Sequence, residues 1–329
     1  MEFPIVDIEH LDDPQCQLDI ANHIARASQT WGFLLLKNHP IPQQDVGDMF
    51  SLARQFFLDE SEAAKSPWPV NTDSIGYSRA LSDRYKDDKA SMWFAGKAGF
   101  LAHNLPALPP FWHTYTAQID DFKQKCHQLI MKLLVCFAIA MDLPDRDFFA
   151  KAHSEDIGNG NVLRMICYPA RTQAPLDTTT RMSSHSDSGS VTLLFQTCAG
   201  LEVESPSGAW VPAPCLPGHI LVNLGDALAF WSGRRLKATR HRVSFATVPH
   251  DRERLSMAYF AKAAPETVLQ PLRSGADDEP MREYKANGLT IQPGITVGEY
   301  SRLIMESIYG APVEPNAQEP RSPTAASAA

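Results

Sequence analysis

The stretch SSHSDSGSVTLLFQ (183–196) places two ionisable side chains, His185 and Asp187, among small polar residues directly before an apolar run. The run VTLLFQ has the β-branched and apolar composition of a buried strand. Residues two apart along an extended chain point to the same side, so this imidazole and this carboxylate can hold one ion together. The serines and the glycine around them leave room for that ion.

The His-x-acid pattern alone decides nothing, because a chain with 11 histidines and 38 acidic residues contains about one such pair by chance. Three such pairs occur here: His10 with Asp12, His153 with Glu155, and His185 with Asp187. The first pair directly follows a predicted strand near the N-terminus, and the second ends a short predicted helix. Only the third stands at the entrance of a β-rich region, so we take it as the candidate site.

The bulk composition is typical of a globular protein with a substantial core. Of the 329 residues, 44% are hydrophobic and 21% are charged. The net charge of −8 argues against a surface that binds nucleic acid. No signal peptide and no apolar run long enough to span a membrane are visible, and the six cysteines form no C-x-x-C pair. We therefore expect a cytoplasmic protein with reduced thiols and without nucleic-acid or membrane partners.

The first half of the chain mixes helical and strand patterns. The apolar periodicity predicts strands at 3–8 and 32–39, and helices at 17–31, from Pro42 onward and at 111–143. The last of these helices is the longest. Residues 66–110 are rich in proline, aromatic side chains and mixed charge, which predicts a long irregular loop, and such loops often carry function.

From residue 161 onward, short β-rich segments alternate with turn residues. Strands so short and so evenly spaced predict a sandwich or barrel. The segments are 161–168, 190–196, 201–204, 208–212, 219–224, 227–231, 238–247 and 255–260. VNLGD (222–226) reads as a turn between two of them.

Thr296 and Glu299 form a capping box that opens a C-terminal helix at 296–309. Residues 312–329 have the composition of a disordered tail.

A third ligand would have to come from another strand, and His241 in LKATRHRVSF (236–245) is the candidate. Two imidazoles and one carboxylate on one side of a metal leave its other positions open, as in non-haem Fe(II) oxygenases. Hydrolytic zinc uses the same donors, so the triad alone leaves both metals open.

Arg254 and Ser256 share one face of a following strand, where a guanidinium and a hydroxyl can hold a carboxylate. Tyr168, ahead of a proline, offers a further hydroxyl.

Together these segments resemble the isopenicillin-N-synthase-like group of Fe(II)/2-oxoglutarate oxygenases. The resemblance rests on HSDSGSVTLLFQ, on GLEVESPSGAWVPAP, on VNLGDALAFWSGRRLKATRHRV, on RLSMAYF and on the N-terminal FPIVDI and WGFLLLKNHPIP, and covers roughly residues 3–310. It implies a double-stranded β-helix core (a distorted jelly roll) with flanking α-helices. It also implies one catalytic domain at 1–311, in which a mixed α/β segment at 1–160 packs on the core at 161–265.

The resemblance also implies roles for individual residues. The Fe(II) ligands would be His185, Asp187 and His241. The clamp for the distal carboxylate of 2-oxoglutarate would be Arg254 and Ser256, with Tyr168 matching the tyrosine of the family's N-x-Y-P segment. Two departures stand out: Ile166 takes the place of the usual asparagine of that segment, and VPHD (248–251) lengthens the hairpin between the third ligand and the clamp.

The implied activity is that of a 2-oxoglutarate-dependent dioxygenase, which uses O₂ to oxidise a C–H bond of a small organic metabolite in secondary metabolism. Hydroxylation, desaturation and ring expansion all stay open. The loop 75–103 would help form the substrate pocket, with these candidate residues: Tyr77, Tyr85, Trp93, Phe94, Phe100, Arg79 and Arg84. Two other functions stay open as well: a same-fold Fe(II) oxidase whose clamp holds the substrate, and a metal-containing binding protein without turnover. No motif encodes the substrate or the oligomeric state.

Overall fold

Two β-sheets form the centre of the computed structural model, which describes residues 2–79, 89–97, 99–158, 160–171, 179–273, 279 and 281–309. The larger sheet has eight strands in the order β1-β2-β10-β7-β12-β5-β4-β3. In that order the strands are Ile5–Asp7, Phe33–Lys37, Ile220–Leu224, Val191–Gln196, Arg254–Ala261, Val162–Tyr168, Ala90–Ala95 and Ile75–Ser78. Neighbouring strands are antiparallel except for β1 and β2 at one edge.

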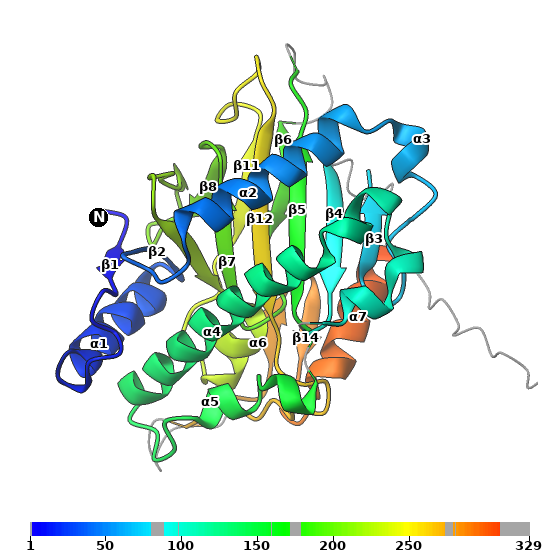
Figure 1. Ribbon diagram of the computed structural model, residues 1–329. Coiled ribbons are helices and arrows are strands. Elements are labelled where there is room, and N and C mark those ends of the chain that lie inside the picture. Colours follow the sequence, from blue (N-terminus) through cyan, green and yellow to red (C-terminus); the bar gives the residue numbers. More distant parts are fainter. Residues whose placement is uncertain are drawn as a thin grey trace, which may run out of the picture.

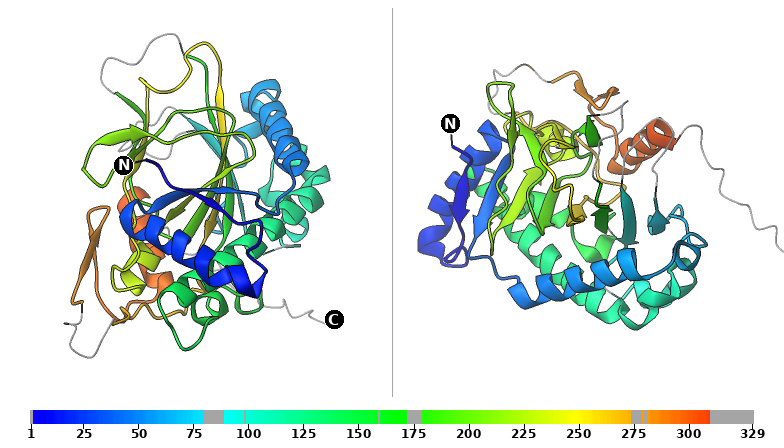
Figure 2. Two further views of the ribbon diagram at one scale, coloured as in Figure 1. Left: turned by 90° about the vertical axis from the view of Figure 1, so that its left-hand side faces the viewer. Right: turned by 90° about the horizontal axis from the view of Figure 1, so that it is seen from above.

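The smaller sheet has four antiparallel strands in the order β6-β11-β8-β9. In that order they are Thr180–His185, His241–Ser244, Leu201–Glu204 and Trp210–Pro212. Apolar side chains of this sheet pack against one face of the larger sheet, where Leu201 and Val243 meet Phe33 and Leu221. The two facing sheets form the jelly-roll core that the sequence predicts (Figures 1 and 2).

Side chains of the larger sheet alternate between its two faces with a period of two. On β12, Leu255 and Met257 belong to the main apolar core, whereas Arg254 and Ser256 line the space between the sheets. The same alternation holds on β5 and β7. One face of the sheet is therefore built for packing, and the other is free to carry polar groups.

Helices cover the packing face of the larger sheet. Figure 1 shows α2 (Gln43–Arg54) and α4 (Thr116–Ala140) crossing in front of it, with α1 (Pro14–Thr30) beside β1 and β2. The predicted apolar stripe of the long helix is confirmed, because these residues are buried in the core: Ile119, Phe122, Cys126, Leu129, Leu133 and Phe137. Helix α4 begins at Thr116 rather than 111, since a 3₁₀ turn at Pro110–Thr114 precedes it.

The remaining elements lie at the ends of the sheets. Short helices α3, α5 and α6 span Glu62–Lys65, Phe148–Lys151 and Asp226–Trp231, and a π-helical turn spans Gln55–Asp59. The hairpin of β13 (Tyr284–Ala286) and β14 (Leu289–Ile291) leads to α7 (Val297–Tyr309). The predicted capping box is confirmed, because Glu299 N–H donates to Thr296 Oγ1 and Thr296 N–H donates to Glu299 Oε2. These last elements lie over one end of the space between the sheets (Figure 2).

Several predictions about secondary structure were wrong. The loop predicted at 66–110 contains β3 and β4, which extend the larger sheet at its edge. The segment 227–231 is helical in α6, because a short apolar run fits a buried helix as well as a strand. Strand β6 was missed, since TRMSSH lacks an apolar alternation. The predicted tail at 312–329 lies outside the described residues, and the domain boundaries at 160, 265 and 311 stay a prediction.

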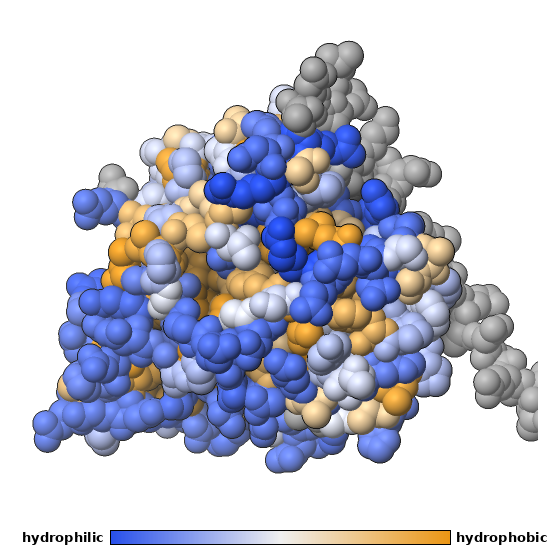
Figure 3. All heavy atoms as spheres, turned by 45° about the horizontal axis from the view of Figure 1, so that its top comes forward, coloured by the Kyte–Doolittle hydropathy of each residue, from blue (hydrophilic) through white to orange (hydrophobic). Residues whose placement is uncertain are grey.

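Exposed large apolar side chains are few among the described residues, and no described helix is long and apolar enough to cross a membrane. The exposed ones include Ile5, Leu18, Leu58, Leu216, Val268 and Met305. The face in Figure 3 shows apolar patches interrupted by hydrophilic side chains rather than one continuous apolar band. Single exposed apolar residues are normal for a globular protein.

Replacing Thr296 by alanine should lower the free energy of unfolding by about 1 kcal/mol, because it removes the hydroxyl that caps the first turn of α7. Urea unfolding followed by circular dichroism measures the change. Thr290→Ala, at an exposed position of β14, is the control and should change the unfolding free energy by much less. Equal effects of the two substitutions would show that the capping box contributes nothing.

Candidate active site

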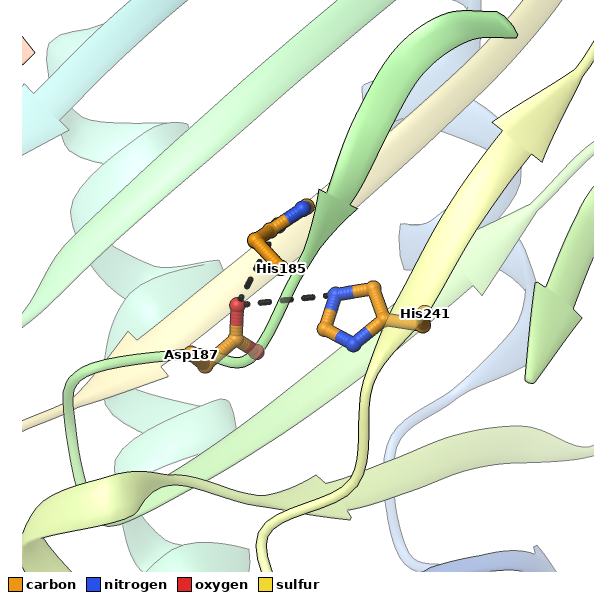
Figure 4. Close-up of side chains that lie close together, drawn as sticks. All are labelled: His185, Asp187 and His241. Carbon is orange, nitrogen blue, oxygen red and sulfur yellow. Dashed lines mark ion pairs between the residues drawn. The ribbon is translucent and has the colours of Figure 1, made fainter. Parts of the chain in front are cut away.

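Three side chains from two strands and a turn converge between the sheets (Figure 4). His185 ends β6 and His241 begins β11, and the two residues are direct partners in the antiparallel pair. Asp187 follows in the turn after β6, and its Oδ1 lies 3.9 Å from His185 Nε2 and 3.7 Å from His241 Nε2. One ligand atom from each residue lies within 4.8 Å of the other two, which is the spacing of a shared metal ion.

Backbone carbonyls orient both imidazoles. Nδ1–H of His185 donates to the carbonyl of Ser183 at 2.8 Å, and Nδ1–H of His241 donates to that of Thr239 at 3.2 Å. Each Nε2 is therefore the nitrogen that carries a lone pair, as a metal ligand requires. Burial, together with the neighbouring histidine, lowers the pKa of His185 to about 4, so this ring is neutral at neutral pH.

The two carboxylate oxygens of Asp187 have different surroundings. Oδ2 accepts hydrogen bonds from Thr192 Oγ1 at 2.6 Å and from Asn223 Nδ2 at 2.7 Å, whereas Oδ1 faces the two histidines. Burial by itself would raise the pKa of Asp187, but the histidines and the two donors outweigh it, and the net pKa is lowered. The side chain is an anion with one oxygen held and the other directed at the histidines.

The turn between the first two candidate ligands is held by residues far along the chain. The amide of Asn287 accepts from the backbone N–H of Ser186 at 3.1 Å and donates to its carbonyl at 2.9 Å. Asp226 joins the same cluster, accepting from Ser186 Oγ at 2.8 Å and from Asn287 Nδ2 at 3.0 Å. Gly225 is needed beside this turn, since a Cβ there would lie 2.1 Å from the carbonyl oxygen of Gly189.

A second polar group lies deeper between the sheets, around Arg254. This side chain is 1% exposed, and its Nη2 donates to Gln196 Oε1 at 2.7 Å while its Nη1 lies 3.4 Å from Ser256 Oγ. The guanidinium also lies over the Tyr168 ring, 5.1 Å from its centre. No carboxylate in the described part of the chain forms an ion pair with Arg254, so its charge is available to an anionic ligand.

Two adjoining cavities connect these groups. The inner one, of about 50 Å³, is lined by all six predicted site residues: His185, Asp187, His241, Arg254, Ser256 and Tyr168. The outer one, of about 650 Å³, shares His185 and Asp187 with it and reaches α7 and the β13–β14 hairpin. Two of the candidate metal ligands, His185 and Asp187, thus lie where the two cavities meet, and His241 lines the inner one.

Family models match two parts of the chain, and known proteins match most of it. The 2OG-Fe(II) oxygenase superfamily matches residues 159–263, and the N-terminal model of the non-haem dioxygenase in morphine synthesis matches 3–101. The UPF0676 protein C1494.01 of Schizosaccharomyces pombe is 32% identical over 85% of this chain and 88% of its own. The chain belongs to the 2-oxoglutarate–Fe(II) oxygenase superfamily.

Other proteins also match most of the length of this chain. The proline hydroxylase buaE of Petromyces alliaceus is 31% identical over 81% of this chain and 91% of its own. The crystal structure of a full-length Neurospora crassa protein in complex with alpha-KG and thymine superposes with a TM-score of 0.77, at 26% identity over 93% of this chain and 97% of that one. The protein is therefore a 2-oxoglutarate-dependent dioxygenase that uses Fe(II), 2-oxoglutarate and O₂ on a small molecule. This result removes the oxidase and the binding protein as leading alternatives.

Among the described residues of the predicted pocket loop, Lys89 and Trp93 line the outer cavity. Tyr77 and Phe94 are instead buried in the main core. Phe100 packs against the same core, and Arg79 pairs with Glu62 at 2.9 Å. Arg84 and Tyr85 lie outside the described residues.

The rejected histidines do not join the site. His10 is exposed, and no ligand-forming cluster within the described ranges includes it. His153 is fully buried, with Nδ1 2.7 Å from the carbonyl of Phe149 and Nε2 2.8 Å from Ser190 Oγ. Burial lowers the pKa of His153 to about 4, which keeps this ring neutral at neutral pH. Its role is structural.

Sequence reasoning missed the residues that support the ligands. The supporting side chains include Thr192, Gln196, Asn223, Asp226 and Asn287. VNLGD was expected to be a turn, but Asn223 lies within β10 and points its amide at Asp187. The available signal was a buried asparagine inside an apolar strand, because a buried amide requires a partner.

Replacing Asn223 by alanine should weaken Fe(II) binding by roughly tenfold to a hundredfold, because it removes one of the two donors that orient Asp187. Anaerobic equilibrium dialysis with Fe(II) measures the affinity. Asn38→Ala is the matched control, since that amide bonds Asp7 at the surface, and should bind Fe(II) as the parent does. Unchanged affinity in Asn223→Ala would contradict the support role.

Proposed function

We propose that His185, Asp187 and His241 hold Fe(II), and that Arg254 and Ser256 hold the distal carboxylate of 2-oxoglutarate. The single observation that carries this proposal is that both groups line one small cavity, and that His185 and Asp187 also line the larger cavity beside it. Two imidazoles and one carboxylate form the donor set of non-haem Fe(II) oxygenases. A buried guanidinium without a carboxylate partner in the described part of the chain suits a dicarboxylic acid.

The residues around the clamp act by binding and orientation. Gln196 accepts a hydrogen bond from one Nη of Arg254, and the ring of Tyr168 lies against the guanidinium. The guanidinium is therefore oriented before the ligand binds. Fe(II) and 2-oxoglutarate together supply the oxidative chemistry, in which O₂ is consumed and succinate and CO₂ are formed. Apolar side chains such as Leu194 and Val243 exclude water from this inner cavity.

The outer cavity is the proposed site of the organic substrate. Its volume of about 650 Å³ suits a small metabolite, and it opens directly at the proposed metal ligands. Hydroxylation of a C–H bond is the favoured reaction, because the relative buaE is named a proline hydroxylase. A role in secondary metabolism is proposed on the family resemblance, with desaturation or ring expansion as other outcomes.

Replacing Asp187 by alanine should abolish turnover while the fold is retained, because it removes the only anionic ligand of the proposed site from a turn outside the apolar core. Succinate formation from 2-oxoglutarate measures turnover, and circular dichroism checks the fold. His10→Ala, at an exposed position, should keep full activity. Normal succinate formation in Asp187→Ala would refute the triad.

Replacing Arg254 by alanine should weaken 2-oxoglutarate binding at least about tenfold, since a charge-assisted hydrogen bond contributes roughly 1.5–3 kcal/mol. The apparent Michaelis constant for 2-oxoglutarate measures the effect. Arg252→Ala is the control, because Arg252 is exposed two residues earlier and lies outside the inner cavity. Ser256→Ala should give an intermediate effect. A change confined to the organic substrate would assign the clamp to that substrate instead.

A further inference from the structure

The charge of the outer cavity is opposite to that of the whole chain. The protein carries a net charge of −8, yet the cationic residues that line this cavity outnumber the acidic ones. The cationic ones are Lys89, Arg164, Arg240, Lys262 and Lys285, and the acidic ones are Asp187 and Asp226. Both acidic side chains are already held by neighbouring donors. The cavity therefore presents positive charge to its occupant.

Lys262 is a cation of this cavity whose stem is held by close packing. It directly follows β12, where its backbone N–H donates to Asn161 Oδ1 at 2.9 Å. Its side chain runs past two glycines: a Cβ at Gly160 would lie 3.3 Å from Lys262 Cδ, and a Cβ at Gly189 would lie 3.3 Å from Lys262 Cγ. Gly189 is two residues beyond Asp187, so the lysine lies beside the turn that carries this candidate ligand.

The ammonium of Lys262 forms no ion pair or hydrogen bond with any of the described residues, although it lines the cavity and is partly buried. Burial lowers the pKa of Lys262, partly offset by the charge of Asp187. Lys285 differs, because it is exposed and pairs with Glu283 at 3.5 Å. A partly buried ammonium without a direct ion-pair partner is costly, and an anionic ligand group would offset that cost.

We propose that the organic substrate carries a carboxylate on an apolar body, and that Lys262 binds this carboxylate; the inference rests on the proposed function of the site. The single charge of a carboxylate matches the single ammonium of Lys262, which has no ion-pair partner among the described residues. Trp93, Phe260 and Ile304 line the same cavity and would contact the apolar body. Lys262 would then hold the charged group of the substrate, while the apolar contacts would place one of its carbon atoms at the metal.

The test measures binding by the anaerobic Fe(II)–2-oxoglutarate complex in a calorimeter. The probes are phenylacetate, cinnamate and 4-phenylbutyrate, each compared with its own primary amide. We expect at least one acid to bind at least about tenfold more tightly than its amide. Lys262→Met and Lys262→Gln should abolish this preference, and Lys285→Met, the matched control at the rim, should keep it.

Three outcomes would overturn the inference. The first is that no acid binds the parent protein more tightly than its amide, including the case in which neither binds. The second is that both Lys262 variants keep the preference. The third is that these variants lose affinity for 2-oxoglutarate, which is measured by the visible absorption band of the anaerobic complex. Failure of the proposed function differs from all three, because the parent protein would then form no 2-oxoglutarate complex at all.

Discussion

The two-residue period of an extended chain is the constraint on which this site depends. In the larger sheet it directs every second side chain into the helix-covered core and the others into the space between the sheets. Arg254 and Ser256 face that space because Leu255 and Met257 are anchored in the core. A slip of one residue in β12 would bury the guanidinium among apolar side chains, so core packing also secures the register of the clamp.

The polar groups between the sheets form hydrogen bonds that leave a defined set of ligand atoms open. Backbone carbonyls take the Nδ1 protons of His185 and His241, and two neutral donors take one oxygen of Asp187. What stays open is one lone pair on each ring and one carboxylate oxygen, all directed to a common point. Such an arrangement is costly to bury without a cation, which agrees with a site that is built around a metal ion.

The six residues that the sequence proposes for the site line one cavity in the structure, whereas several secondary-structure elements predicted around them were wrong. The His-x-acid and Arg-x-Ser spacings are weak signals by themselves, and the resemblance joins them with His241 and Tyr168 into one pattern. Strand β6 was missed because TRMSSH is mostly polar and lacks apolar alternation, and helix α6 was missed because DALAFW is buried on all sides. Asn223 and Asn287 could not be assigned, since their partners lie 36 and 101 positions away in the chain.

Asn287 has a consequence for how the protein is made. Both histidines and the aspartate have been synthesised by residue 241, but the amide that fixes the backbone of Ser186 arrives 46 positions later. A nascent chain that has not yet reached the β13–β14 hairpin carries every candidate ligand without the contact that holds their spacing. The candidate site therefore reaches the geometry described above only when the C-terminal hairpin lies against the Ser186 turn.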